Sequence, residues 1–489
     1  YAAVSNDLFC LVEFAKVAGI PLSFCEDAAI NTLVRDSIID QKTLFSEIAA
    51  LAPGEYVSYE SGSVAIKNQW TWSSLNSGNY NEAIDDVCHS ILTTLRGYYH
   101  GSSEREHVVS LTGGLDSRII LAAILAEGLE NEFVFGTSGM PTSPDQIFAK
   151  GLRNQFGLSS YIAESGGQSD EADVILELWI KKTLGIRPVE FIHINNHGPV
   201  RSVNYGGYSG EILKGFYSNQ AIKKIGASNR SAAMALSIEE LINVLSESLD
   251  RAWTTSPVFF DKYDFNALDS GLHPLALIDT RYVLSRNRSH FGLYQRIRST
   301  NSIYCAPLST LAALKAAMLC DPYDRSLGRA SLDVLAKLSP ALALMPGTFH
   351  PLPQNYSSWL GLHTPADRLL LSFPDNFLRT PSLSNRALKI QNSKEYHKSS
   401  NKWMSPEDAY RIHSSTMEKI SQFDFGKFMN VKYFKRKIEG HYNGLFHNEK
   451  HKYYWLRLVG IIGVFEYAQS FSSLNGEVDR RAKMTSSVK

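Results

Sequence analysis

One short stretch, residues 108–125 (VVSLTGGLDSRIILAAIL), limits the folds that are open to this chain. It begins with β-branched residues typical of a buried strand, turns at Gly113 and Gly114, and continues in Ile, Leu and Ala. A strand that passes directly into a helix is typical of a βαβ unit, whose strands are parallel. Backbone N–H groups converge at such a turn, with the positive end of the helix dipole behind them. The stretch therefore predicts an anion-binding turn at the carboxyl end of a parallel strand.

The segments around this stretch continue the alternation of strands and helices. Ser143, Pro144 and Gln146 supply the N-cap, the first helical residue and the capping box expected at the start of a helix. We expect an α/β fold, in which a Rossmann-like parallel sheet carries helices on both faces. The periodicity predicts strands at 107–111, 132–136 and 159–164, and helices at 81–99, 116–127 and 143–157.

The pattern along the chain predicts three regions. Residues 1–75 are expected to be a small β-rich unit, with a hairpin at 54–68 that turns at Ser61–Gly62. Residues 76–350 hold the alternation of strands and helices, and residues 351–489 are expected to form a helical region packed on it. Further helices are predicted at 237–253, where Ser237 and Glu240 form a capping box, and at 309–319, 329–338 and 458–465.

Composition argues against several classes of protein. The 489 residues include 49 Lys plus Arg and 49 Asp plus Glu, so the zero net charge argues against a general nucleic-acid binder. Five cysteines without C-x-x-C spacing argue against a disulfide framework or a zinc site. The longest apolar run near the C-terminus, 458–465, is shorter than the about 20 residues that a membrane-spanning helix needs. We therefore expect a cytoplasmic protein with neither nucleic acid nor membrane as a partner.

The glycine turn has the residues of a phosphate-binding loop. Gly113 and Gly114 allow a phosphate to approach the backbone, and the hydroxyls of Thr112 and Ser117 add donors. The loop lacks the G-K-[ST] of a Walker A motif. Because like charges repel, Asp116 would act by holding Mg²⁺ that bridges the phosphates. The alternative is an ordinary strand-to-helix turn in which Asp116 and Ser117 are capping residues.

Residues 110–118 (SLTGGLDSR) resemble the pyrophosphate loop, S-G-G-x-D-S, of ATP pyrophosphatases, with Thr112 in place of the usual Ser. Enzymes with this loop cleave ATP between its α and β phosphates, and they include tRNA-modifying and GMP-forming enzymes. Segments 42–70, 133–158 and 207–217 are similar to the asparagine synthetase family, so the resemblance covers roughly residues 40 to 340. It implies ATP and Mg²⁺ as cofactors.

The resemblance also implies a set of site residues. The loop would bind the pyrophosphate and Mg²⁺, while Ser110, Leu111 and Phe135 would frame the adenine; a buried strand aromatic is the alternative for Phe135. Ser143 and Asp145 either approach the nucleotide or cap a helix. The expected nucleotide-binding residues are Ser110, Leu111, Thr112, Gly113, Gly114, Asp116, Ser117 and Phe135.

The chain departs from the family in the segment 207–217. Gly210 stands where asparagine synthetases carry an Asp that helps to bind metal and pyrophosphate, so Glu211 is expected to take over the metal role beside Asp116. The alternative for Glu211 is a solvated carboxylate at the start of a helix. The family's lysine, which neutralises charge in the acyl-adenylate transition state, has no counterpart after 339–346. Lys214 is the expected catalytic substitute, with Arg329 and Lys337 as alternatives.

The resemblance implies an ATP-dependent ligase that adenylates a carboxylate and then forms an amide with ammonia or an amine. The substrate is expected to be a sugar acid or other small metabolite. The alternatives are a cyclase of the β-lactam synthetase or lasso-peptide type, and a degenerate homologue that binds nucleotide without catalysis. The catalytic residues are expected to be Glu211, through the metal, and Lys214, which would neutralise charge at the reacting centre.

Glutamine is not expected to be the nitrogen donor of this chain. The family's glutaminase needs a Cys as first residue, whereas this chain begins with Tyr1, and Cys10 lies in an apolar stretch (8–15) where burial is expected. Residues 1–75 would then be the remnant of a glutaminase-like domain. The nitrogen would come from ammonia, from an amine, or through a partner chain or an N-terminal segment absent here.

Overall fold

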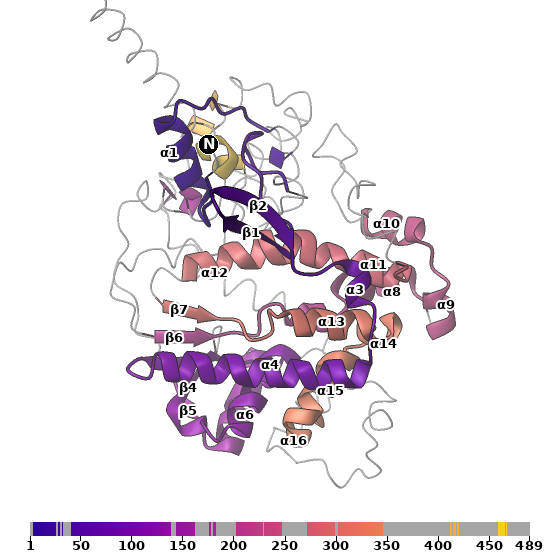
Figure 1. The fold of residues 1–489 in the computed structure, drawn as a ribbon. Coiled ribbons are helices and arrows are strands. Elements are labelled where there is room, and N and C mark those ends of the chain that lie inside the picture. Colours follow the sequence, from indigo (N-terminus) through magenta and orange to yellow (C-terminus); the bar gives the residue numbers. More distant parts are fainter. Residues whose placement is uncertain are drawn as a thin grey trace, which may run out of the picture.

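The computed structural model gives the fold of most of the first 345 residues and of a few short segments after them (Figure 1). The described residues are 3–25, 28–29, 32, 41–137, 143–161, 176–177, 179–181, 202–227, 229–246, 271–298, 302–345, 411–412, 414–416, 418–419, 458–464 and 466.

A five-stranded parallel sheet in the order β5-β4-β3-β6-β7 forms the centre of the fold. The chain first builds outward from β3 on one side and then returns to the other side through β6, so the strand order reverses at β3. Open α/β sheets bind ligands at the carboxyl ends of the strands beside such a reversal. The strands are β3 (Glu106–Ser110), β4 (Phe133–Gly136), β5 (Ser159–Ser160), β6 (Ser202–Tyr205) and β7 (Ser302–Cys305).

This sheet confirms the α/β prediction, and the expected helices lie close to their predicted bounds. In Figure 1, α4 runs across the front of the sheet. Ser143 caps α6 by accepting from the N–H of Gln146, and Gly157 ends that helix with a φ of 64°. The side chain of Gln146 donates to the carbonyl of Thr137, so the predicted capping box is wrong. The helices are α4 (Tyr80–Gly101), α5 (Leu115–Ala126) and α6 (Pro144–Phe156).

The strand predicted at 159–164 is described only as far as β5, since 162–164 lie outside the described residues. The helix predicted at 237–253 is α10 (Ile238–Ser246), and its residues from 247 onward also lie outside the described part. The capping box at its start is confirmed. The N–H of Ser237 donates to Glu240 at 2.8 Å, and the N–H of Glu240 donates to the Ser237 hydroxyl at 3.2 Å.

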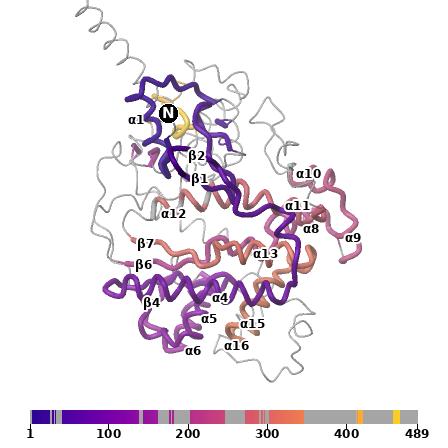
Figure 2. The backbone as a smooth tube through the Cα atoms, viewed as in Figure 1, coloured from indigo at the N-terminus to yellow at the C-terminus, as the bar shows by residue number. Residues whose placement is uncertain are grey.

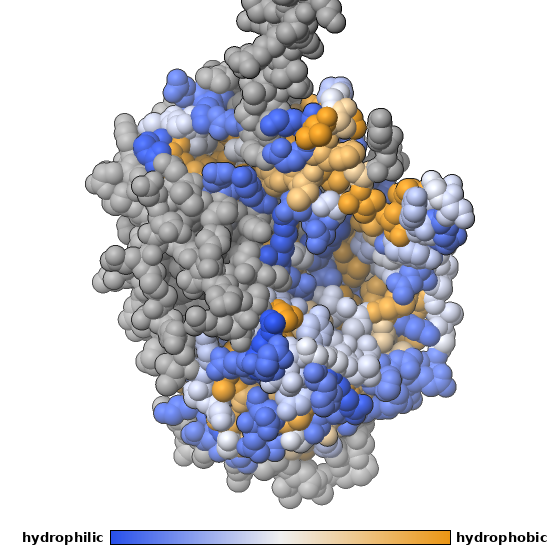
Figure 3. Space-filling model, turned by 60° about the vertical axis from the view of Figure 1, so that its left-hand side comes forward, coloured by the Kyte–Doolittle hydropathy of each residue, from blue (hydrophilic) through white to orange (hydrophobic). Residues whose placement is uncertain are grey.

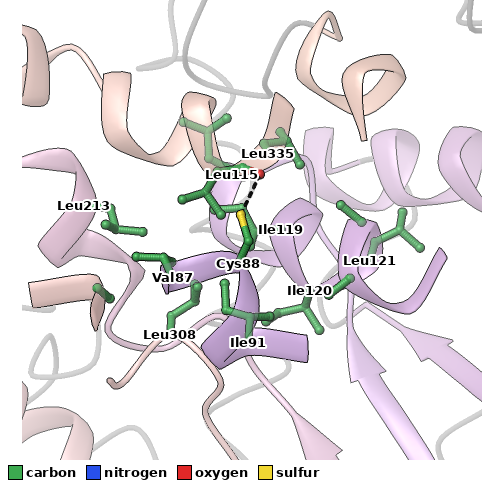
Figure 4. Close-up of a cluster of buried hydrophobic side chains, with 14 of the residues drawn as sticks. Val87, Cys88, Ile91, Leu115, Ile119, Ile120, Leu121, Leu213, Leu308 and Leu335 are labelled. Atoms are coloured by element: carbon green, nitrogen blue, oxygen red, sulfur yellow. Dashed lines mark hydrogen bonds between the residues drawn. The ribbon is translucent and has the colours of Figure 1, made fainter. Parts of the chain in front are cut away.

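The main core lies between α4, α5 and the helices that follow the sheet (Figure 4). Helix α5 is buried on nearly every side, and Ile119, Ile120 and Leu121 are at most 1% exposed. Helix α4 is amphipathic and turns Val87 and Ile91 toward it. Burying one such side chain stabilises the fold by about 1.5–3 kcal/mol. This packing fixes the start of α5, and therefore the glycine turn, against a rigid surface.

The remaining helices lie mostly toward the carboxyl ends of β6 and β7, while the helix at 293–298 runs alongside β7 (Figure 1). The helices predicted at 309–319 and 329–338 are α13 and α15, and are confirmed. The remaining helices include the 3₁₀ helix η3 (Gly210–Lys214), α8 (Phe216–Ile225), α9 (Arg230–Met234), α11 (Pro274–Arg281), the π-helix η7 (Tyr282–Gly292), α12 (Leu293–Arg298), α13 (Leu311–Leu319), α14 (Pro322–Ser326), α15 (Arg329–Leu338) and α16 (Pro340–Ala343), together with α10.

The hairpin predicted at 54–68 is confirmed. Strands β1 (Glu55–Glu60) and β2 (Ser63–Asn68) pair antiparallel, and Ser61 and Gly62 take left-handed φ values of 52° and 85° between them. The chain then enters the short helix α3 (Trp72–Leu75).

The prediction that Cys10 is buried is wrong, because its side chain is exposed. It lies on α1 (Leu8–Val17), which buries Phe9, Val12 and Ala15 along one stripe. Apolar residues lie on more than one side of this helix, but a surface helix packs only one stripe against its neighbours. Cys10 lies on the other face, as does Phe14, which is 39% exposed.

The C-terminal segment 458–464 is helical, as predicted, and is drawn in the upper part of Figure 2. Leu458, Val459, Ile461, Ile462 and Val464 are buried. Within the described residues, no helix has both the length and the hydrophobicity needed to cross a bilayer. Hydrophilic and hydrophobic side chains are interspersed over the described surface in Figure 3.

Candidate functional site

The turn between β3 and α5 is held in shape by its own hydroxyls. The N–H of Thr112 donates to the Ser117 hydroxyl at 3.1 Å, and the N–H of Gly114 donates to the Thr112 hydroxyl at 3.1 Å. The two hydroxyls lie 3.0 Å apart. The N–H of Gly113 donates to Asp145 Oδ1 at 3.3 Å, which joins the start of α6 to the loop. The turn is therefore preorganised, and Asp145 reaches it while Ser143 acts as a helix cap.

Helix α5 begins directly behind this turn. Gly114 is its N-cap residue and has no side chain that could cap the helix. Asp116 lies in the first turn. The positive end of the helix dipole favours the negative charge of Asp116 there. Ser110, at the end of β3, is exposed, whereas Leu111 and Phe135 are fully buried. The buried position of Phe135 matches the alternative reading, a strand aromatic of the core.

The structure brings Glu211 and Lys214 to Asp116 from far along the chain. Lys214 Nζ lies 2.6 Å from Asp116 Oδ2, an ion pair between residues 98 positions apart. Glu211 belongs to the same 3₁₀ helix, η3, and accepts a hydrogen bond of 2.9 Å from the Tyr282 hydroxyl. The three charged residues expected to carry the chemistry therefore lie together, at the carboxyl ends of β3 and β6.

One oxygen of Asp116 is not satisfied. Asp116 Oδ1 is buried and has no hydrogen-bond partner among the described residues. A buried carboxylate oxygen without a donor costs free energy, so native structures rarely leave one in that state without a functional reason. A cation or a donor supplied by a ligand would satisfy this oxygen.

The charges of the cluster shift one another's pKa values. Burial raises the pKa of Glu211, and the negative charge of Asp116 raises it further, against smaller opposing effects that include Lys214 and the Tyr282 hydrogen bond. Burial lowers the pKa of Lys214, but the charges of Asp116 and Glu211 outweigh it and raise that pKa overall. Burial also raises the pKa of Tyr282, which keeps its hydroxyl a donor. Lys214 therefore remains a cation at neutral pH.

Asp116 can occupy its position because the two residues packed against it, Gly207 and Gly210, have no side chains. A Cβ on Gly210 would lie 2.4 Å from both Cγ and Oδ1 of Asp116, and a Cβ on Gly207 would lie 2.8 Å from its backbone carbon. Any side chain at either position would force the first turn of α5 or the carboxylate to move. An Asp at position 210 could not fit this arrangement, because its Cβ would overlap the carboxylate of Asp116.

The residues present fit a magnesium ion that arrives with a nucleotide. Among the described residues, no three His, Cys, Asp or Glu side chains gather as ligands. Mg²⁺ in nucleotide sites usually takes one or two carboxylates and completes its shell with phosphate oxygens and water. Asp116, with its unsatisfied Oδ1, and Glu211 provide two such carboxylates.

The alternative cations lie elsewhere. Arg329 pairs with Asp324 at 2.8 Å, and Lys337 pairs with Asp85 on the surface. Both are ordinary ion pairs between helices. Neither cation belongs to the cluster of Asp116, Glu211 and Lys214.

Several residues beside the site had no signal in the sequence. Tyr282 packs 5.2 Å from Phe216 and 6.2 Å from Phe291, measured between ring centroids, and Tyr208 lies 5.3 Å from Phe291. Arg286 lies over the ring of Phe216, at 5.1 Å. Most of them belong to the π-helix η7 or follow β6, and a π-helix shifts the register that an α-helical periodicity would predict. π-Helical turns occur often at functional sites.

Ser209 adds a second unusual backbone feature at the site. Its φ of 71° is uncommon for a residue other than glycine and costs of order 1 kcal/mol. The Ser209 hydroxyl donates to Asn287 Oδ1 at 2.8 Å, so η7 helps to hold this turn. The strained turn directs η3, and with it Glu211 and Lys214, toward Asp116.

The chain matches no protein-family model, and a sequence search of curated proteins finds no match.

Proposed function

We propose that this protein is an ATP-dependent ligase that adenylates a substrate carboxylate, releases pyrophosphate, and forms an amide by displacement of AMP. The observation that carries the proposal is the carboxylate of Asp116. It lies in the first turn of α5 behind a glycine turn, has an unsatisfied buried oxygen, and pairs with Lys214. A glycine turn at a helix N-terminus favours phosphates, and an acidic residue inside that turn requires a cation between itself and them.

The residues of the turn would position the pyrophosphate. The N–H groups of Thr112, Gly113 and Gly114 donate to side chains in this structure. Pyrophosphate would replace these acceptors, among them the Ser117 hydroxyl and Asp145, on a frame that the core holds rigid. Asp116 and Glu211 would hold Mg²⁺, which when bound neutralises the phosphates and favours pyrophosphate as the leaving group.

Lys214 supplies the cation for the transition state. Its pKa is raised, so the ammonium is charged at neutral pH and can stabilise the negative charge that develops during acyl transfer. Positioning and charge stabilisation then account for catalysis, because the acyl-adenylate needs no nucleophile from the protein.

The acyl substrate is proposed to have an apolar body. Tyr208, Phe216 and Phe291 are half-buried beside the charged cluster, and Arg286 lies among them. Such a wall favours a carboxylate larger and less polar than aspartate. The amine is proposed to be ammonia or an amine of the substrate itself, and the latter would make the enzyme a cyclase.

The products of ATP test the proposal. The protein would be incubated with ATP, Mg²⁺ and a panel of aromatic and aliphatic carboxylic acids, with ammonium and glutamine in separate reactions. AMP and pyrophosphate are expected, dependent on one of the acids. ADP and orthophosphate would place the enzyme in another class, and an absence of ATP binding would refute the assignment altogether.

A further inference from the structure

We propose that Lys214 occupies the cation position on Asp116 until nucleotide arrives, so that the divalent metal enters only as its complex with the nucleotide. This inference rests on the proposed function and concerns the order in which the site of that function is filled.

The ion pair is close and shielded. Lys214 Nζ lies 2.6 Å from Asp116 Oδ2, and the two side chains are only 22% and 16% exposed. A pair with so little water around it is screened much less than one on the surface. A free divalent cation approaching the same carboxylate would meet the ammonium already in contact with it.

The surroundings of Asp116 make Lys214 its main neutralising group. The other oxygen, Oδ1, is buried without a partner among the described residues, and Gly207 and Gly210 leave no side chain to contact it. Glu211 lies nearby and raises the pKa of Lys214 together with Asp116, so it also favours a cation at this place. The nucleotide-free site therefore holds its cation on one oxygen and keeps the other available.

An arriving nucleotide changes which charged groups pair with Lys214 and Asp116. Phosphate oxygens offer the ammonium a second anionic partner, and the metal that accompanies them offers Asp116 a stronger cation. Lys214 would exchange Asp116 for a phosphate oxygen, so that no charge is left unpaired at any stage.

The backbone around Lys214 permits such an exchange. Its 3₁₀ helix runs between Ser209 and Gly215, which have left-handed φ values of 71° and 63°. Such short helices have weaker hydrogen-bond geometry than an α-helix. Gly215 follows Lys214 directly, so the lysine stands at the end of this helix rather than inside a long one.

The test measures Mn²⁺ binding, by electron paramagnetic resonance of the free ion, to the full chain without nucleotide. Lys214→Met should bind Mn²⁺ about tenfold more tightly than the unchanged protein. Lys337→Met is the matched control: it removes the lysine of another carboxylate pair, with Asp85, which lies outside the site. It should change the affinity by less than about threefold.

A second titration uses Mn²⁺ with α,β-methylene ATP, an analogue that cannot be cleaved between its α and β phosphates. Here Lys214→Met should weaken binding of the metal and analogue by about tenfold, since the phosphate loses its ammonium. Lys214→Gln repeats both measurements should the methionine variant fail to fold.

The outcomes separate the inference from the proposed function. Equal Mn²⁺ affinities for the unchanged protein and for both Lys214 variants would overturn the exchange, as would an equal gain in Lys337→Met. Binding of Mn²⁺ with the analogue to the unchanged protein would still support the proposed function in those cases. Failure of the unchanged protein to bind the analogue with Mn²⁺ would overturn both.

Discussion

Two carboxylate–cation pairs lie in the same part of the molecule and differ in how fully they are satisfied. Asp279 pairs with Arg325 at 2.9 Å, and the two side chains are 5% and 0% exposed. Asp279 also accepts from the N–H groups of Tyr217 and Ser218 and from the Ser218 hydroxyl. Asp116 has Lys214 on one oxygen and, among the described residues, nothing on the other.

The difference indicates two roles. Asp279 holds the start of α8 with both carboxylate oxygens hydrogen-bonded. Arg325 adds a hydrogen bond of 2.6 Å to the carbonyl of Ala317, so this pair ties helices together even though Arg325 Nε has no partner among the described residues. A half-satisfied pair contributes less to folding and keeps capacity for a ligand. Both pairs join opposite charges, and they differ in burial and in the hydrogen bonds that the carboxylate accepts.

The largest effect on stability is expected from Asp279→Asn. It leaves the guanidinium of Arg325 buried without its counter-charge, and breaking a buried pair in this way costs about 3–5 kcal/mol. Unfolding in urea, followed by circular dichroism, measures the loss. The double variant Asp279→Asn with Arg325→Met should recover part of it, and a loss below about 1 kcal/mol would show that the pair is not structural.

Asp116→Asn should reduce activity, whereas Asp279→Asn should reduce stability. Turnover of ATP to AMP is expected to fall by about 10²–10³-fold, because the metal and Lys214 lose their carboxylate. The midpoint of urea unfolding should hardly change, since the fold does not depend on a half-satisfied pair. Asp85→Asn, on the surface of α4, serves as the control. Undiminished turnover in Asp116→Asn would contradict the assignment of the loop.

Gly210→Ala tests whether the free space around Asp116 matters. The added Cβ would lie 2.4 Å from the carboxylate carbon, so the carboxylate must move, and nucleotide binding should weaken by about tenfold. Gly101→Ala is the matched change, because a Cβ there meets no described atom within 4 Å. Fluorescence titration with an ATP analogue measures both, and equal affinities would show that Asp116 need not hold this position.

The smallest effect concerns a third polar pair, which is neutral. His107 Nδ1 lies 2.9 Å from the Tyr205 hydroxyl in the core, and burial lowers the pKa of His107 below its usual 6.5. The unfolded chain then binds the proton more readily than the folded one. Stability should therefore be complete above pH 6.5 and fall as the pH drops below it, by at most about 1.4 kcal/mol per pH unit.

His107→Gln should remove this part of the pH dependence. Urea unfolding of both proteins at pH 7.5 and 5.5 gives the comparison. The same loss of stability on acidification in the variant would show that another group is responsible.

Features that depend on neighbouring residues could be predicted from the amino-acid sequence. The β-branched run, the two glycines and the apolar helix that follows predicted β3, its turn and α5, because backbone preference and periodicity are local properties. The same reasoning identified Asp116 and the helix that starts at Ser143.

Other features were decided by the tertiary structure. The contact of Lys214 with Asp116 joins residues 98 positions apart, and no local pattern indicates which distant cation will meet a carboxylate. Cys10 is exposed because α1 buries only one of its apolar faces, a choice made by its neighbours rather than by its composition. Tyr282 reaches Glu211 from a π-helix whose register the α-helical period does not give. These contacts depend on how the helices and strands are placed relative to one another. The sequence of one helix or strand indicates which of its own residues are apolar, but not which residues of another element they will meet.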